Sequence, residues 1–286
     1  MASLSFGVGA QPSPSWSLDA SKGGWHEDRL ALQYFHHSEM QRQWAWHLLG
    51  RYPLPPDAHV LDFGCGDGKI TAELSHFLPE GHIVGMDLSP SMLRVATRCF
   101  PQSYYPNLFF SSKPGTGLYD LICAFSVFHL ISDPIEVLKS LSDNLIPHGQ
   151  LWLVIPCGNN PAFFQAATET LQRYQLPLPW ASSPGTLPSS AMMRTQEGCI
   201  HCLNAAGFQP ISVTALHTPT AFFNKEELIA WMIGTVSANW QIPLDIADRF
   251  FSELVDRMAA LDPEIIDSQG CYSMKLSRLE VIAQKI

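Results

Sequence analysis

Residues 59–68 read HVLDFGCGDG, an apolar run followed at once by three glycines at alternate positions. The apolar run predicts a buried strand over 59–63. The glycines let the backbone turn sharply and approach a ligand closely, which side chains would prevent. A turn of this kind follows the first strand of nucleotide-binding α/β sheets. Position 69, where a dinucleotide-binding turn has its third glycine, is a lysine, which disfavours a nicotinamide cofactor.

An acid follows the next predicted strand. Residues 82–93 read HIVGMDLSPSML, which predicts a strand over 82–86 and then a helix with Ser89 as its cap and Pro90 at its first position. Asp87 lies between them, where a carboxylate can bridge the two hydroxyls of a ribose. The alternative, an acid that only initiates the helix, is less favoured because Ser89 already provides the cap. The glycine turn and Asp87 together indicate a nucleoside-containing ligand.

The remaining chain continues this alternation of strands and helices. Further strands are predicted at 107–110, 119–125, 150–155, 208–216 and 272–284, and helices at 25–49, about 68–78, 133–145, 161–174, 195–206 and, as a pair, 224–260. Alternating strands and helices imply parallel pairing, because each crossover returns over the sheet. We therefore expect a doubly wound, Rossmann-like α/β fold with a seven-stranded sheet, mostly parallel with an antiparallel last strand, and a helical lid.

The same pattern divides the chain. Residues 1–24 are rich in Ser, Gly and Pro without any period, and we expect a disordered leader there. We expect an N-terminal helical region over 25–58, the cofactor-binding core over 59–155 and a lid insertion over 156–194. Residues 195–286 then complete the sheet (195–217 and 270–286) and add a helical cap (222–262).

Composition limits the partners. Seventeen basic residues against 26 acidic ones give a net charge of −9, which disfavours nucleic acid because that binding needs clustered cations. The sequence has no targeting signal and no apolar run of about 18 residues, so we expect a cytoplasmic protein without a membrane span. Seven cysteines, an odd number, indicate reduced thiols. Cys199 and Cys202 form a C-x-x-C pair without a second pair of ligands, and no metal is expected.

The motifs around these strands resemble those of class I S-adenosylmethionine-dependent methyltransferases. They are the acid and glycines at 62–68, the segment GMDLSPSML at 85–93, YDLI at 119–122 and LIPHG at 145–149. The resemblance implies S-adenosylmethionine as cofactor. The residues it assigns to cofactor binding are Asp62, Gly64, Cys65, Gly66 and Gly68 in the turn, Asp87 at the ribose, Leu88 and Met92 at the adenine, Ser111 and Ser112 where relatives carry an acid for the adenine amine, and Phe125 and Ser126 after the fourth strand.

A narrower resemblance concerns the acceptor. The spacing Tyr34-x-x-x-Ser38-x-x-Gln41-x-x-x-Ala45 is similar to the first helix of juvenile hormone acid methyltransferases, and trans-aconitate and malonyl-carrier-protein methyltransferases share parts of it. All three groups methylate carboxylates. The resemblance implies that Gln41 holds the acceptor carboxylate, His129 orients it, and Tyr34 lines the cofactor end of the cavity. Leu130 stands where the group has a tryptophan. We also expect Phe128 and Trp231 in the acceptor pocket.

The predicted activity is therefore methylation of a small, largely apolar carboxylic acid. Two alternatives stay open. A small-molecule N- or C-methyltransferase would use His129 as a base, and a protein of this fold can bind S-adenosylmethionine without transferring its methyl group. The partner in each enzymatic case is a small molecule. The sequence does not indicate an oligomeric state.

Overall fold

The computed structural model describes residues 27–115, 117–158, 160–179 and 189–286, so the predicted leader lies outside the described residues. Its centre is a seven-stranded sheet with the order β3-β2-β1-β4-β5-β7-β6. The strands are β1 (His59–Phe63), β2 (His82–Met86), β3 (Leu108–Ser111), β4 (Tyr119–Phe125), β5 (Leu145–Cys157), β6 (Phe208–Phe222) and β7 (Tyr272–Lys285). Strands β1 to β5 pair in parallel, and β7 is antiparallel to both β5 and β6. The predicted fold class is confirmed.

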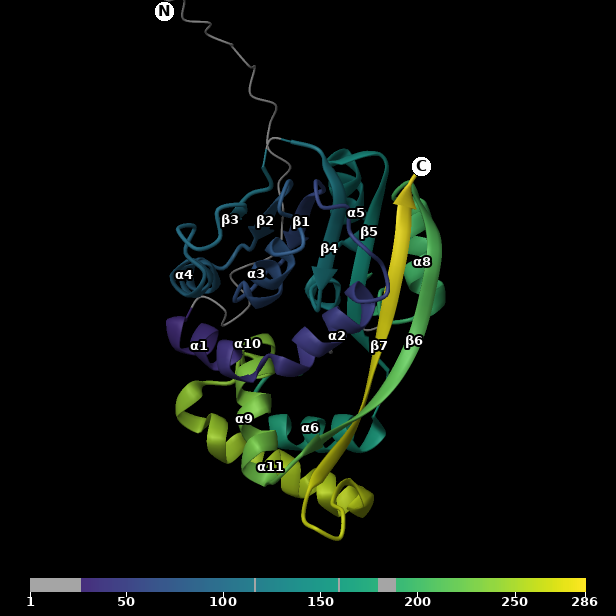
Figure 1. Cartoon of the computed structure of the whole chain (residues 1–286). Coiled ribbons are helices and arrows are strands. Elements are labelled where there is room, and N and C mark those ends of the chain that lie inside the picture. Colours follow the sequence, from purple (N-terminus) through teal and green to yellow (C-terminus); the bar gives the residue numbers. More distant parts are fainter. Residues whose placement is uncertain (1–26, 116, 159, 180–188) are drawn as a thin grey trace, which may run out of the picture.

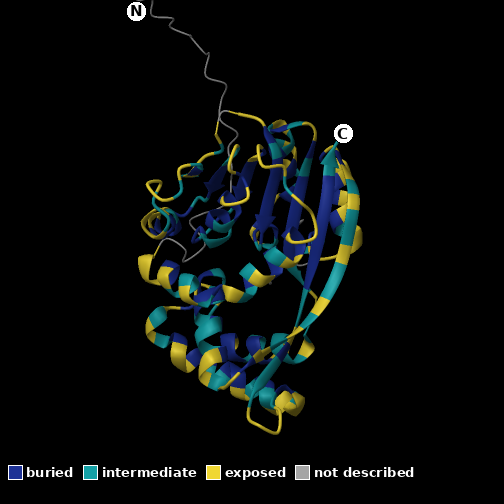
Figure 2. Cartoon of the chain, viewed as in Figure 1, coloured by how far each residue is buried: buried dark blue, intermediate teal, exposed yellow. Residues whose placement is uncertain are grey.

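Helices cover both faces of this sheet (Figure 1). On one face, α2 (Glu39–Leu49) and α3 (Lys69–Ser75) bury Trp44, Leu48 and Leu74 against the sheet. On the other face, α5 (Pro134–Asp143) and α8 (Gln196–Ala205) bury Leu138 and Leu203. The strands between them are buried on both sides, as Figure 2 shows for the centre of the sheet. Burial on both faces explains why the central strands are continuous apolar runs.

A helical cap lies beyond the carboxyl ends of the parallel strands (Figure 1). It consists of α6 (Pro161–Arg173), α9 (Lys225–Thr235), α10 (Ser237–Trp240) and α11 (Leu244–Leu261). Phe250, Phe251 and Leu254 of α11 form its core together with Phe222 from the end of β6 and Met274 from the start of β7. The two long strands therefore run out of the sheet into the cap and connect the two hydrophobic cores.

Helix α1 (Asp28–His37) joins the cap to the cofactor-binding core. It packs against α9 on one side and against α4 (Pro90–Cys99) on the other. The predicted continuous helix over 25–49 is wrong, because the helix breaks at Ser38 into α1 and α2. Ser38 is buried at this break, and its hydroxyl bonds outside the helix.

Several boundaries also differ from the prediction. Helix α5 ends at Asp143 rather than at 145, because β5 already begins at Leu145. Helix α3 ends at Ser75 rather than near 78. Strand β6 continues to Phe222 instead of 216, since its whole length pairs with β7. The predicted caps are confirmed: Ser89 accepts the N–H of Met92, and Asp133 accepts the N–H of Glu136.

The predicted lid insertion does not form a separate layer within the described residues. Its helix α6 belongs to the core of the cap, where Ala166, Ala167 and Leu171 pack with α11. The following short helix α7 (Ser189–Met192) lies beside the 3₁₀ helix η3 (Phe128–Leu130) instead. Residues 180–188, which belong to the predicted lid insertion over 156–194, lie outside the described part of the chain. In that described part, no helix has the length and apolar character needed to span a membrane.

Candidate cofactor and acceptor site

The turn after β1 adopts the conformation that its glycines predict. Gly64, Gly66 and Gly68 have φ angles of +77°, +54° and +78°, a region that other residues enter at a cost. Two of the three also have no room for a side chain. A Cβ on Gly64 would lie 2.3 Å from Cγ2 of Val127, and one on Gly68 would lie 2.6 Å from Cζ of Phe110. The turn is therefore fixed by both backbone conformation and packing.

Asp87 connects this turn to the end of β2. Its Oδ2 accepts the backbone N–H of Gly66 at 2.9 Å, and its Oδ1 accepts the N–H of Ser89 at 2.8 Å. The carboxylate is half-buried and a carboxylate oxygen can accept more than one donor. The hydroxyls of a ribose beside the glycine turn can donate hydrogen bonds to this carboxylate. The residues present therefore fit S-adenosylmethionine.

Asp62 lies at the bottom of the turn and is buried. Thr71 donates its hydroxyl to Asp62 at 2.7 Å. Burial raises the pKa of the Asp62 carboxyl to about 7, and the nearby charges of Asp87 and Asp67 also raise it, whereas the Thr71 hydrogen bond opposes this. A cationic group bound at this position would favour the ionised carboxylate. The methionine ammonium of the expected cofactor is such a group.

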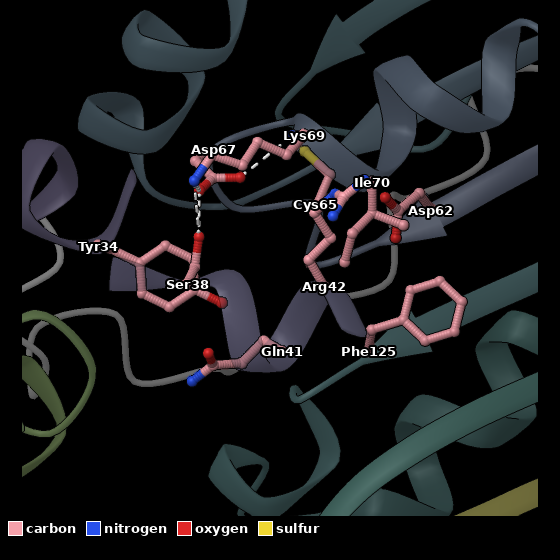
Figure 3. Close-up of a pocket in the computed structure, with 11 residues that line it drawn as sticks. Tyr34, Ser38, Gln41, Arg42, Asp62, Cys65, Asp67, Lys69, Ile70 and Phe125 are labelled. Atoms are coloured by element: carbon pink, nitrogen blue, oxygen red, sulfur yellow. Dashed lines mark hydrogen bonds and ion pairs between the residues drawn. The ribbon is translucent and has the colours of Figure 1, made fainter. Parts of the chain in front are cut away.

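The break between α1 and α2 is bound to the glycine turn. The Ser38 hydroxyl donates to Oδ2 of Asp67 at 2.8 Å, and the Lys69 ammonium donates to the same hydroxyl at 3.1 Å. Lys69 also donates to the carbonyl oxygen of Phe35 and lies 4.2 Å from the centre of its ring. Figure 3 shows Ser38, Asp67 and Lys69 side by side at one end of the pocket, with dashed lines between them. Lys69, whose presence disfavours a dinucleotide cofactor, therefore connects the end of α1 and Ser38 to the glycine turn.

Tyr34 and Gln41 lie on one side of the resulting pocket, and Asp62 and Phe125 lie on the other (Figure 3). A Cβ on Gly66 would lie 3.6 Å from Cε1 of Tyr34, so the tyrosine ring lies next to the turn. The cavity has a volume of about 20 Å³, which is room for about one water molecule.

A buried ionic cluster holds α2 against the last strands. Glu280 of β7 is fully buried and pairs with Arg278 at 2.9 Å and with Arg51 and His47 at 2.7 Å each. The Arg278 guanidinium also lies 5.3 Å from the centre of the Trp44 ring. Charges placed this deeply must be paired, because an unpaired buried charge is strongly destabilising. The cluster fixes the helix that carries Gln41.

Six buried side-chain atoms have no hydrogen-bond partner among the described residues, and four of them belong to residues that the sequence analysis assigned to the cofactor or acceptor site. These four atoms are Oε1 of Gln41, Oγ of Ser126, Nδ1 of His129 and Nε1 of Trp231. They come from α2, the end of β4, η3 and α9, so elements from the core and the cap both contribute. Buried polar atoms in native proteins are usually paired. The unpaired Oε1 of Gln41 accepts hydrogen bonds, whereas the amide nitrogen of the same side chain donates them.

His129 and Tyr34, two ionisable residues that the sequence analysis assigned to the acceptor and the cofactor end of the cavity, do not titrate near neutral pH. Burial lowers the pKa of the His129 imidazole to about 3, and the positive charge of Arg194 lowers it further. Burial and the surrounding carboxylates raise the pKa of the Tyr34 phenol far above its usual value. Both side chains are therefore neutral at pH 7, and both can act as hydrogen-bonding groups without exchanging a proton.

The other predicted site residues occupy different surroundings. Cys65 and Phe125 line the pocket, Met92 is buried against Ala31 of α1, and Leu88 packs at the edge of the sheet core. Ser111 ends β3 and Ser112 is exposed beside it. Phe128 is fully buried, with its ring 6.2 Å from that of Phe63, so it supports the sheet instead of facing an open pocket. Trp231 packs on Phe222 at 5.5 Å.

The contacts also show site residues whose importance the sequence analysis missed. Asp67 and Lys69 belong to the quoted turn, and their charges were the available signal. Cys199 and Cys202 are both buried in α8, where burial raises the pKa of each thiol. Within the described ranges, no three His, Cys, Asp or Glu side chains form a group suited to a metal ion.

Comparisons with known proteins agree with this geometry. A family model described as a methyltransferase domain matches residues 35–213, more than half of the chain. The trans-aconitate 2-methyltransferase of Deinococcus radiodurans is 27% identical over 227 residues, which cover 78% of this chain and 85% of that protein. A malonyl-[acyl-carrier protein] O-methyltransferase of Halalkalibacterium halodurans is 36% identical over 101 residues, 32% of this chain and 36% of that protein.

A solved structure of similar fold is a methyltransferase from Bacillus halodurans, described there as putative. It superposes with a TM-score of 0.55 at 16% identity and covers 84% of this chain and 97% of that one. At this identity the likeness concerns the fold alone.

Proposed function

The chain belongs to the methyltransferase family whose domain covers residues 35–213, and from that premise we propose that it methylates a carboxylate of a small organic acid. Its methyl donor is S-adenosylmethionine. One carboxylate oxygen of the acceptor attacks the methyl carbon, and the bond from that carbon to sulfur breaks with its electron pair moving to sulfur. The products are a methyl ester and S-adenosylhomocysteine.

One observation carries the choice of a carboxylate: the histidine assigned to the acceptor, His129, has no pKa near neutral pH. A useful general base has a pKa close to the working pH, whereas that of His129 is about 3. Asp62 has a pKa of about 7, but it is buried below the turn and bonded to Thr71. Amine, phenol and carbon acceptors must usually lose a proton. A carboxylate is already ionised.

The residues then act by alignment. The Gln41 amide donates a hydrogen bond to the carboxylate without carrying a charge that would reduce its nucleophilicity. His129, neutral at working pH, orients the same group or the adjoining part of the acceptor. Tyr34 separates the glycine turn from the acceptor side. Holding the two reacting atoms in line while the cap excludes water can supply up to about 7 to 11 kcal/mol.

The names of the relatives support this proposal, since both act on carboxylates. The N- or C-methylation alternative is less favoured, because it needs His129 as a base and burial keeps its pKa low. The third alternative is a protein that binds the cofactor without transferring its methyl group. It differs from both enzymatic alternatives in that it forms no methylated product.

The experiment uses methyl-labelled S-adenosylmethionine with a panel of organic acids and amines. We expect label in a product that mild alkali releases as methanol, as methyl esters are hydrolysed under these conditions. An alkali-stable methylated product would overturn the carboxylate proposal and leave the family assignment intact. Cofactor binding without turnover on any acceptor would favour the non-catalytic alternative.

A further inference from the structure

The backbone of Ser126, directly after β4, is strained. Its φ angle is +60°, in the left-handed region that residues other than glycine enter at a cost. Among the described residues, His148, Gln175 and Gln241 share this region. Gln175 and Gln241 follow the helices α6 and α10, where a left-handed residue commonly ends a helix. Ser126 lies between a strand and η3 instead, so no helix end accounts for its conformation.

The Ser126 side chain is buried without a partner. Its backbone N–H donates to the carbonyl oxygen of Val154 in β5 at 2.7 Å, which holds the residue in place. Its hydroxyl oxygen is buried and has no hydrogen-bond partner among the described residues. Burying an unpaired hydroxyl costs free energy, and glycine at this position would avoid both this cost and the strain. Strain and an unpaired buried group at one residue are typical of functional sites.

Ser126 lies where a sheet with this strand order binds its ligand. The order β3-β2-β1-β4-β5 reverses direction between β1 and β4, and ligands bind outside the carboxyl ends of the strands at such a point. Phe125, the preceding residue, lines the pocket (Figure 3). Val127, the following residue, packs against Gly64, since a Cβ on that glycine would lie 2.3 Å from its Cγ2. The neighbours of Ser126 in the chain therefore contact the pocket and the glycine turn.

The place of Ser126 along this edge favours the acceptor over the cofactor. The residues that fit the cofactor, the glycine turn and Asp87, follow β1 and β2. Ser126 follows β4, on the other side of β1, and is bonded to β5. His129, which the sequence analysis assigned to the acceptor, comes three residues later in η3. Ser126 is thus on the side of the sheet to which the acceptor is assigned.

We propose that the Ser126 hydroxyl donates a hydrogen bond to the acceptor carboxylate. This inference rests on the proposed carboxylate methylation, and it moves Ser126 from the cofactor, to which the resemblance assigned it, to the acceptor. The unpaired Oε1 of Gln41 can only accept hydrogen bonds, whereas a hydroxyl can donate them. A neutral donor orients the carboxylate without neutralising the charge that attacks the methyl carbon. The fixed backbone places this donor before the acceptor arrives.

The test measures kcat/KM for Ser126→Gly and Ser126→Ala with the best acceptor from a panel of linear mono- and dicarboxylic acids. Both variants lose the hydroxyl, but glycine adopts a φ of +60° without strain and alanine does not. We expect kcat/KM to fall by about 10- to 150-fold in both, the range for a hydrogen bond to a charged group. Affinity for S-adenosylhomocysteine should be unchanged. Ser126→Gly should melt about 2 to 4 °C above Ser126→Ala, because it relieves the strain.

His148→Gly is the matched control, since His148 is exposed near the amino end of β5 and has a φ of +64°. Its kcat/KM should equal that of wild type. Wild-type kcat/KM in Ser126→Gly would overturn the inference, because the serine would then serve only the conformation of the chain. A loss of affinity for S-adenosylhomocysteine would also overturn it, since the hydroxyl would then bind the cofactor. If wild type forms no alkali-labile methyl ester with any acid, the proposed function itself fails, and that outcome is distinct from both.

Discussion

The glycine turn and the acceptor side are built in opposite ways. In the turn, almost every polar group has a partner within the chain: Asp62 binds Thr71, Asp67 binds Ser38, and Asp87 binds two backbone N–H groups. On the acceptor side, Gln41 and His129 keep buried atoms without a partner among the described residues. The first region is completed by its own sequence. The second keeps unpaired polar atoms, which is where we propose that the acceptor binds, so the first region would be common to the family and the second particular to this chain.

The largest effect should come from Asp87, the residue that connects the turn to the ribose position. Asp87→Ala removes charge-assisted hydrogen bonds to two hydroxyls, each worth about 1.5 to 3 kcal/mol. We expect the affinity for S-adenosylhomocysteine to fall by about 10²- to 10⁴-fold in calorimetry. Asp57→Ala, at an exposed position before β1, is the control. Unchanged affinity in a folded Asp87→Ala protein would place the ribose elsewhere.

The rigidity of the turn is tested by two glycines with nearly equal backbone angles. Gly64 has a φ of +77° and contacts Val127, whereas Gly207 has a φ of +80° and open space around it. Gly207→Ala should cost about 1 to 2 kcal/mol of unfolding free energy from backbone strain alone. Gly64→Ala should cost about 1 to 3 kcal/mol more from overpacking. Urea unfolding measures both.

Adding Val127→Ala to Gly64→Ala should recover part of the second loss, because it removes the methyl groups in contact. Equal losses for the two single variants would mean that packing does not hold the turn. The contrast with the acceptor side would then be weaker than the contacts suggest.

The acceptor side is tested by Gln41→Ala. Loss of the amide donor should lower kcat/KM by about 1 to 3 kcal/mol in transition-state free energy, while the affinity for S-adenosylhomocysteine changes little. Gln43 on the same helix is exposed and bonds only to Glu39 at 3.2 Å among the described residues. Gln43→Ala should leave both quantities unchanged. Parallel losses of turnover and cofactor affinity would remove Gln41 from the acceptor side.

The smallest effect concerns the neutral His129. Its pKa of about 3 in the folded protein lies below the value of about 6.5 in an unfolded chain. The unfolded state therefore binds more protons between these values, and stability falls as the pH falls from about 6.5 towards 3. His129→Gln should reduce this dependence by at most about 1.4 kcal/mol for each pH unit. Thermal unfolding between pH 7 and 5 measures it.

The exposed His201 provides the control, since His201→Gln should leave the slope unchanged. A slope in His129→Gln equal to that of wild type would indicate that His129 is solvated and titrates normally. In that case the argument against a base on the acceptor side would lose its main support.

The sequence predicts the core of this fold well. The bounds of β1, β2 and β4 coincide with the predicted strands 59–63, 82–86 and 119–125, because parallel strands buried on both faces are apolar runs that end at polar residues or glycine. The break at Ser38 escaped prediction since its cause is a contact with Asp67, 29 residues away. The extension of β6 to Phe222 depends on pairing with β7.

The residues proposed to bind the acceptor were harder to predict from the sequence, because their properties also depend on neighbours in space. Whether Gln41 or Trp231 has an unpaired buried atom depends on what surrounds it in space, and no spacing in the chain indicates that. The low pKa of His129 has the same origin, since burial causes it.

The position of β7 has a consequence for how the protein is made. Strand β7 pairs with β5 on one edge and β6 on the other, so the sheet stays divided until residue 285 has been synthesised. Until then the nascent chain presents two unpaired strand edges, which are templates for association with other chains. Pairings between residues so distant in sequence form slowly. The closing of the sheet is thus a late step that waits for β7, and chaperones that shield strand edges would act in the interval before it.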